Sequence, residues 1–196
     1  KPVFLVDFSE LEQGPEGLAE ADVQGLIDHH RLGTLITRGP LDAWIRAVGC
    51  SATVLLELMG HETLSRAQAR LLLGAIVSDT FNFTSPTTTP QDRAAVERLL
   101  PIADLALAPF AQTLLEHRTQ LGDSPMSELL VADEKRYQIA GHTLMVSQIC
   151  VMDPAQLLDR MAELYEAMHI RLEQDSLDAY VLMLTDLARG ESLLHC

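Results

Sequence analysis

The sequence predicts an α/β protein with a parallel-sheet domain over residues 1–118 and a smaller, incomplete α/β domain with a mixed sheet over residues 126–196. In the first part, short apolar runs are followed by longer stretches with the apolar spacing of helices, which is typical of a parallel sheet. The pattern lapses over residues 119–125, which we interpret as a linker or hinge. Beyond it, a β-hairpin signal and an amphipathic helix indicate the second domain.

Three apolar runs predict the strands of the first domain. Residues 3–6 read as a buried parallel strand, residues 23–27 as the next one and residues 44–48 as a third, shorter one. Residues 10–21 contain a Gly-Pro pair and predict a loop with a short helix.

Helical spacing dominates the rest of this domain. A helix is expected to open at Gly49-Cys50-Ser51, with the Ser51 hydroxyl as its N-cap, and Ser65 is expected to cap a second helix. A third helix is predicted from Pro90 to about residue 100, and a fourth over residues 104–117.

The second domain combines strands with one long helix. Residues 136–139 and 143–151 predict two strands joined by a hairpin, and residues 179–184 predict a further buried strand. Pro154 is predicted to start a long amphipathic helix, whose 3.6-residue apolar spacing assigns Tyr165 to the core.

The charge balance limits the partners that this chain can have. Its 28 acidic residues outnumber 14 basic ones, giving a formal net charge of −14, and the arginines are scattered singly. A surface of this sign repels nucleic-acid backbones, so we expect no nucleic-acid partner. An anionic substrate would need divalent cations to supply positive charge.

Cysteine usage and hydropathy point to the cytoplasm. The three cysteines form no CxxC pair and are odd in number, which argues against a disulfide framework and for a reducing compartment. The apolar runs are far shorter than the roughly 20 residues that span a bilayer, so we expect no membrane partner. The lone histidines, His61 among them, are expected to have no catalytic role.

Polar side chains follow the ends of the predicted elements. Asp7 follows the first strand, Asp28-His29-His30 follow the second, and Asp79 follows an apolar helix. Ligands of parallel sheets bind at the carboxyl ends of the strands, so Asp7 and Asp28-His29-His30 are expected to converge on one crevice. Carboxylates combined with imidazole suit a first-row divalent ion such as Mn²⁺, and Mg²⁺ less strongly. Neighbouring histidines on an extended segment point in different directions, so only one is expected to bind the metal.

Together, these motifs make the sequence resemble the DHH phosphoesterase superfamily, most closely the manganese-dependent (family II) inorganic pyrophosphatases. The resemblance covers essentially the whole chain. It rests on Leu5-Val6-Asp7, Ile27-Asp28-His29-His30-Arg31, Val48-Gly49-Cys50-Ser51-Ala52-Thr53 and Val77-Ser78-Asp79-Thr80 with Ser85-Pro86-Thr87-Thr88.

The resemblance implies a role for each of five residues. Asp7 matches a carboxylate that bridges two metal ions, and His29 and Asp79 match ligands of the second ion. His30 matches a catalytic histidine that contacts the substrate phosphate. Asp28 would not bind a metal ion itself but would orient an imidazole. The implied reaction is hydrolysis of pyrophosphate to two phosphates by a hydroxide shared between two Mn²⁺ ions, with Mg²⁺ or Co²⁺ as alternatives.

Departures from the family pattern leave alternatives open. The family's N-terminal His-x-x-x-Asp-x-Asp motif does not occur here, which is expected if the chain is truncated at both ends. Phe8 replaces a histidine, and Ser124 stands near an expected phosphate-binding lysine. A related DHH phosphodiesterase or exopolyphosphatase, and a degenerate non-catalytic regulatory domain, are the alternatives.

The resemblance also sets expectations for the parent protein. We expect it to be a cytoplasmic homodimer that acts on a small anionic phosphate. These 196 residues alone are expected to be inactive, because they lack half of the metal ligands and most of the basic residues that grip phosphate.

Overall fold

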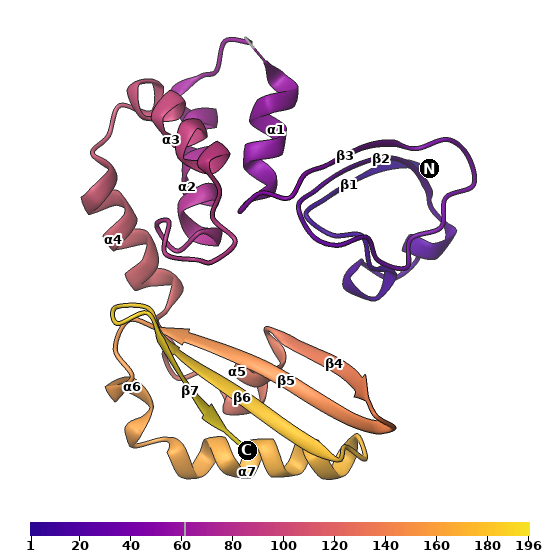
Figure 1. The fold of residues 1–196 in the computed structure, drawn as a ribbon, viewed down its shortest axis with the longest axis vertical. Coiled ribbons are helices and arrows are strands. Elements are labelled where there is room, and N and C mark those ends of the chain that lie inside the picture. Colours follow the sequence, from indigo (N-terminus) through magenta and orange to yellow (C-terminus); the bar gives the residue numbers. More distant parts are fainter. Residues whose placement is uncertain (61) are drawn as a thin grey trace. The chain divides into compact units, whose positions relative to one another are not determined.

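A computed structural model describes residues 1–60 and 62–196, so His61 lies outside the described residues. The chain divides into two compact units, Lys1–Leu114 and Leu115–Cys196 (Figure 1). The predicted linker, residues 119–125, follows shortly after this division. The α/β class is confirmed, because the first unit holds a parallel three-stranded sheet and the second a mixed four-stranded one.

The first sheet contains β1 (Pro2–Val6), β2 (Asp22–Asp28) and β3 (Asp42–Ile45), all parallel and in that order. The third strand ends earlier than predicted. The connection between β1 and β2 contains two 3₁₀ turns, η1 (Leu11–Gln13) and η2 (Leu18–Glu20).

The expectation that the first strand is buried was wrong for one of its faces. Leu5 is buried against Leu26, whereas Phe4 and Val6 are 68% and 54% exposed. Because side chains alternate across a strand, packing on one side leaves the other set outside.

Four helices form the main core of the first unit: α1 (Ser51–Met59), α2 (Arg66–Asp79), α3 (Pro90–Ala103) and α4 (Leu107–Arg118). Buried residues from α1 to α4 pack in one cluster, which includes Leu56, Leu73 and Leu99. No single helix among the described residues is long and apolar enough to cross a membrane; α3 and α4 pass that test only as a pair bent by 104°.

The N-termini of α1 and α2 are capped in different ways. Ser65 caps α2 as predicted, in a capping box with Gln68. The prediction that Ser51 caps α1 was wrong: the N-cap is Cys50, whose sulfur accepts a hydrogen bond from the Ala52 amide. The Ser51 hydroxyl is thereby available for another contact.

The second unit contains α5 (Met126–Val131), β4 (Glu134–Ile139), β5 (His142–Val151), α6 (Ala155–Leu158), α7 (Met161–Gln174), β6 (Ala179–Asp186) and β7 (Glu191–His195). Strand order is β4-β5-β6-β7, with β5 and β6 parallel and the outer pairs antiparallel. Positive φ angles at Ala140 and Gly141 make the predicted hairpin turn. Residues from α5, α6 and α7 pack with the sheet in a second core cluster (Figure 1).

The single long helix predicted from Pro154 was wrong. It is two helices, α6 and α7, separated at Asp159-Arg160. Tyr165, assigned to the core by its spacing, is 46% exposed. Its hydroxyl lies 2.8 Å from Nδ1 of His195, the last residue of β7, a strand that was not predicted.

Candidate metal centre

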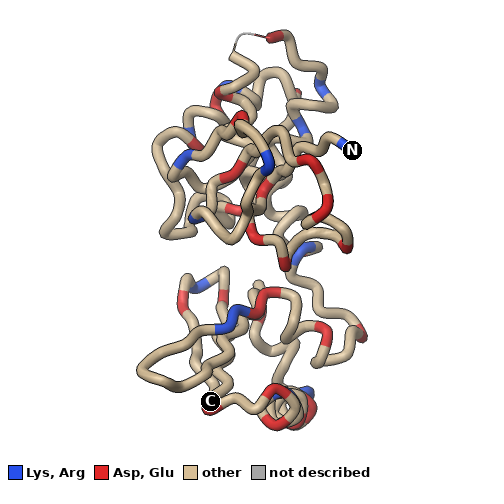
Figure 2. Tube along the Cα trace, turned by 90° about the vertical axis from the view of Figure 1, so that its right-hand side faces the viewer, with Lys and Arg blue, Asp and Glu red and all other residues tan. Residues whose placement is uncertain are grey.

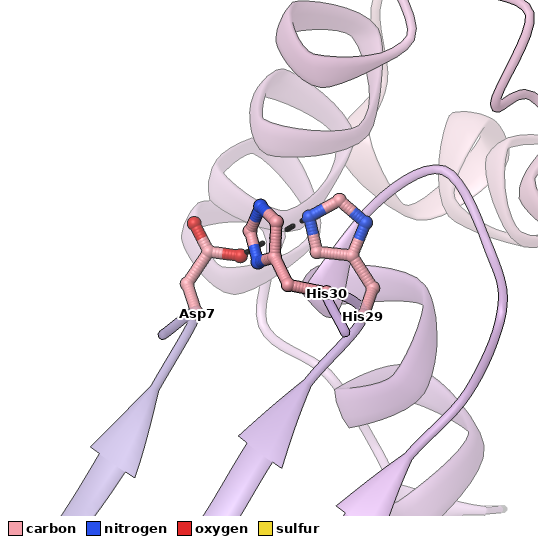
Figure 3. A group of neighbouring side chains, drawn as sticks. All are labelled: Asp7, His29 and His30. Carbon is pink, nitrogen blue, oxygen red and sulfur yellow. Dashed lines mark ion pairs between the residues drawn. The ribbon is translucent and has the colours of Figure 1, made fainter. Parts of the chain in front are cut away.

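The carboxyl ends of β1 and β2 bring three of the predicted site residues together. Asp7 directly follows β1, and His29 and His30 directly follow β2, so their side chains rise from neighbouring strands (Figure 3). One ligand atom from each residue lies within 4.8 Å of those of the other two. Parallel pairing of the strands therefore produces a compact carboxylate and imidazole cluster at one edge of the sheet.

Asp7 is fixed by both its backbone and its side chain. Its φ is 74°, in the left-handed region that Asp tolerates better than most residues. Its amide donates to the Ile27 carbonyl at 2.9 Å, which holds this turn against β2. Its Oδ1 accepts the Ser51 hydroxyl at 2.7 Å, and half of the Asp7 side chain remains exposed.

His29 has its tautomer set by a backbone contact. Its Nδ1 lies 3.0 Å from the Val48 carbonyl oxygen, which can only accept, so Nδ1 carries the proton. In the neutral ring, Nε2 then carries the lone pair, and it lies 3.4 Å from Oδ1 of Asp7. The His29 side chain is only 12% exposed, so this arrangement is held in a protected position.

His30 is more open and is held by Asp28. The Asp28 carboxylate is 1% exposed, and its Oδ1 lies 2.8 Å from Nδ1 of His30. The same oxygen accepts the amides of His29 and His30 at 2.8 and 3.1 Å. The His30 side chain is 53% exposed, so its outer nitrogen can reach a small molecule above the sheet.

The cluster fits a first-row divalent ion. Two atoms that each bind such an ion at about 2.0–2.2 Å, with bonds at about 90–105°, lie roughly 3–3.5 Å apart. The 3.4 Å separation of Asp7 Oδ1 and His29 Nε2 lies in this range. A carboxylate with imidazole also suits Mn²⁺. The second contact made by each group, to Ser51 and to Val48, is the outer support that metal ligands commonly have.

Asp79 lies outside this group of three. It is the last residue of α2, and its carboxylate acts on the thiol of Cys50. Burial, with smaller effects of Asp79 and Asp7, raises the pKa of the Cys50 thiol far above its ordinary value. The start of α1 thus contacts Asp7 through Ser51 and places Cys50 near Asp79.

The sequence did not single out Asp92 as part of this region. Asp92 lies in the first turn of α3, is fully buried and accepts hydrogen bonds from the Gly49 amide and the Thr53 hydroxyl. Burial alone would raise its pKa, but the bonds from Thr53, Thr89 and Gly49 outweigh burial and hold the pKa below its usual value. The one available signal was an acidic residue at the third position of a capping box.

Charged residues of both signs occur along the whole chain. Acidic and basic residues are interleaved over both units in the view of Figure 2, and the acidic ones are in excess.

The chain is similar to several known proteins. Residues 112–196 match the DHHA2 domain family. The chain is 34% identical over 98% of its length to a probable manganese-dependent inorganic pyrophosphatase of Enterococcus faecalis, of which it covers 63%. It is also 34% identical, over 98% of its length, to a manganese-dependent inorganic pyrophosphatase of Methanothrix thermoacetophila, of which it covers 62%.

A solved structure also has a similar fold. The chain superposes with a TM-score of 0.85 on a putative family II inorganic pyrophosphatase of Methanococcus jannaschii. The two are 30% identical, and the match covers 99% of this chain and 68% of the other. The chain therefore belongs to the manganese-dependent (family II) inorganic pyrophosphatase family.

Proposed function

We propose that the full-length protein hydrolyses inorganic pyrophosphate to two phosphates and depends on Mn²⁺. The observation that carries the proposal is the Asp7, His29 and His30 cluster at the carboxyl ends of β1 and β2. The names of the relatives support the substrate and the metal. The activity is proposed for the whole protein, because this chain spans about 63% of the length of the Enterococcus relative.

The proposed roles follow from what each side chain contacts. Asp7 and His29 would bind metal through Oδ1 and Nε2, and Asp79 would supply a further carboxylate from the end of α2. Two bound Mn²⁺ ions would lower the pKa of a shared water and neutralise the charge of pyrophosphate. His30, held by Asp28 through Nδ1, would contact the substrate phosphate through its exposed side.

Residues 1–196 alone are expected to be inactive. They carry three of the metal ligands that the resemblance implies, and no cluster of arginines or lysines that would grip a phosphate. The homodimer and the cytoplasmic location also remain predictions, and light scattering on the purified full-length protein would test the dimer.

A substrate panel tests this proposal. Hydrolysis by the full-length protein would be measured over a titration of Mn²⁺ as phosphate release from pyrophosphate and from a short polyphosphate, and as mononucleotide release from a dinucleotide. We expect Mn²⁺-dependent release with a clear preference for pyrophosphate. Preference for either of the other substrates would contradict the proposal and favour a related DHH phosphoesterase. Absence of turnover with all three, while Mn²⁺ still binds, would favour a regulatory domain.

A further inference from the structure

Residues 48–51, which lead from β3 into α1, contact two of the proposed metal ligands; we call this segment the anchor loop. The Val48 carbonyl oxygen accepts the Nδ1 proton of His29 at 3.0 Å. The Ser51 hydroxyl donates to Asp7 Oδ1 at 2.7 Å. The position of this loop therefore sets the orientation of both the imidazole and the carboxylate.

The same loop reaches the third proposed ligand. The thiol of Cys50 lies near the Asp79 carboxylate, which raises its pKa, while its sulfur accepts the Ala52 amide at 3.3 Å. One short segment thus contacts the ligands that follow β1 and β2 and lies near the one that ends α2. A shift of the loop would move all three together.

Asp92 connects α3 to the anchor loop at Gly49 and to the first turn of α1 at Thr53. Its Oδ2 accepts the Gly49 amide at 2.8 Å, and its Oδ1 accepts the Thr53 hydroxyl at 2.6 Å. These partners lie 43 and 39 residues away in the sequence. Asp92 is fully buried, so no water competes for these bonds.

Helix capping does not require these two long-range bonds. The capping box of α3 is complete with Thr89, whose amide and hydroxyl both donate to Asp92 Oδ2, at 2.8 and 2.6 Å. Asp92 also lies very close to the backbone of the anchor loop at Gly49. A Cβ at Gly49 would lie 2.9 Å from Asp92 Oδ2 and 2.7 Å from the Thr80 Cγ2 methyl carbon.

We propose that Asp92 is a positioning residue for the metal centre, which holds the anchor loop so that Asp7 and His29 keep the separation that one ion requires. The proposal rests on the proposed function, since it assumes that these two residues bind metal. It assigns no contact between Asp92 and the metal or the substrate. Asp92 acts through the Gly49 amide and the Thr53 hydroxyl.

Two measurements on the full-length protein test this role. The first is Mn²⁺ affinity, from the electron paramagnetic resonance signal of free Mn²⁺. The second, on metal-free protein, is the ¹⁵N NMR spectrum of the His29 ring, which reports whether Nδ1 carries the proton. The variants are Asp92→Ala, Asp92→Asn and Thr53→Val. Ser65→Ala is the control, because it removes the N-cap of α2 without touching the anchor loop.

The expected results distinguish positioning from a structural role. Asp92→Ala should weaken Mn²⁺ binding at least about 10-fold and give a mixture of His29 tautomers. Thr53→Val should weaken binding by a smaller factor in the same direction. Asp92→Asn, which keeps an acceptor toward Gly49, should stay within about 3-fold of wild type, and Ser65→Ala within about 2-fold. If Asp92→Ala lowers the melting temperature but leaves Mn²⁺ affinity and the His29 spectrum at wild-type values, the proposal is overturned.

The two proposals fail in different ways. If wild-type protein binds no Mn²⁺, the proposed function is wrong. The His29 spectrum then decides the positioning role on its own. An Asp92→Ala spectrum with one Nδ1-protonated tautomer, as in wild type, would contradict it.

Discussion

Oδ1 of Asp28 contacts His30 at two points, because it lies 2.8 Å from the ring nitrogen Nδ1 and accepts the His30 amide, and it also accepts the amide of His29. A single buried oxygen therefore fixes both the turn after β2 and the ring orientation of the proposed substrate-binding histidine. Asp28 Oδ2 has no hydrogen-bond partner among the described residues. Only one half of this carboxylate is thus needed for these contacts.

Asp28 offers a test of this relationship by substitution. Asp28→Ala leaves two amides without an acceptor, and each unpaired donor costs about 1–3 kcal/mol, so we expect a loss of about 2–6 kcal/mol in unfolding free energy. Asp28→Asn keeps an acceptor at the Oδ1 position and is expected to cost less than about 1.5 kcal/mol. Urea unfolding of both variants checks this. Equal losses would show that the Oδ1 contacts do not stabilise the turn.

Gly49 is predicted to tolerate no side chain. An added Cβ would meet Asp92 and Thr80 at distances that real Cβ atoms essentially never show. Gly49→Ala should therefore destabilise the protein by about 1–3 kcal/mol through overpacking, and it should also weaken Mn²⁺ binding. Gly39→Ala is the control, because a Cβ there meets nothing within 4 Å. If thermal unfolding shows that the two variants are equally stable, the close approach of Asp92 and Thr80 to Gly49 is contradicted.

Two leucines on α2 provide a matched pair for the core. Leu73 is fully buried in the main cluster of the first unit, whereas Leu71 is 75% exposed. Leu73→Ala should lower the unfolding free energy by about 2–5 kcal/mol, and Leu71→Ala by less than about 0.5 kcal/mol. Urea denaturation measures both. Similar losses for the two variants would contradict the exposed position of Leu71.

We predict that the protein loses stability at alkaline pH because Tyr180 ionises. Burial, with the nearby Glu134 carboxylate, raises the pKa of Tyr180 to about 12. The unfolded chain ionises this phenol near pH 10, so its contribution is fully present below pH 10 and is lost between about pH 10 and 12. Two pKa units correspond to about 3 kcal/mol. The difference in unfolding free energy between wild type and Tyr180→Phe should fall over this range; a constant difference would contradict the raised pKa.

Local patterns predicted most of the elements. The strands other than β7, the hairpin and the capped start of α2 depend on residues close in sequence, so alternation, turn residues and capping signals were enough. The ends of two parallel strands also predicted that Asp7 and His29-His30 meet, because strand polarity alone brings them to one edge.

Features that depend on distant contacts were missed. The break before α7 occurs at Arg160, whose guanidinium donates to the carbonyls of Gly122 and Ser124, almost 40 residues earlier. The contacts of Asp92 with the anchor loop span a similar distance. The residue spacing along one segment does not indicate which distant residues contact it. Asp92 therefore looked like an ordinary residue at a helix start.

The most direct test of the account is phosphate release from pyrophosphate by the full-length protein, measured against Mn²⁺ concentration for wild type, His29→Ala and His169→Ala. His169 is an exposed residue of α7, paired with Glu173, and serves as the control. We predict Mn²⁺-dependent release by wild type and His169→Ala and a loss of at least about 100-fold for His29→Ala, since removing a metal ligand costs more than the 10- to 100-fold that its supporting partners are worth. Equal release by all three proteins, or release that does not depend on metal, would contradict a catalytic metal centre at the ends of β1 and β2.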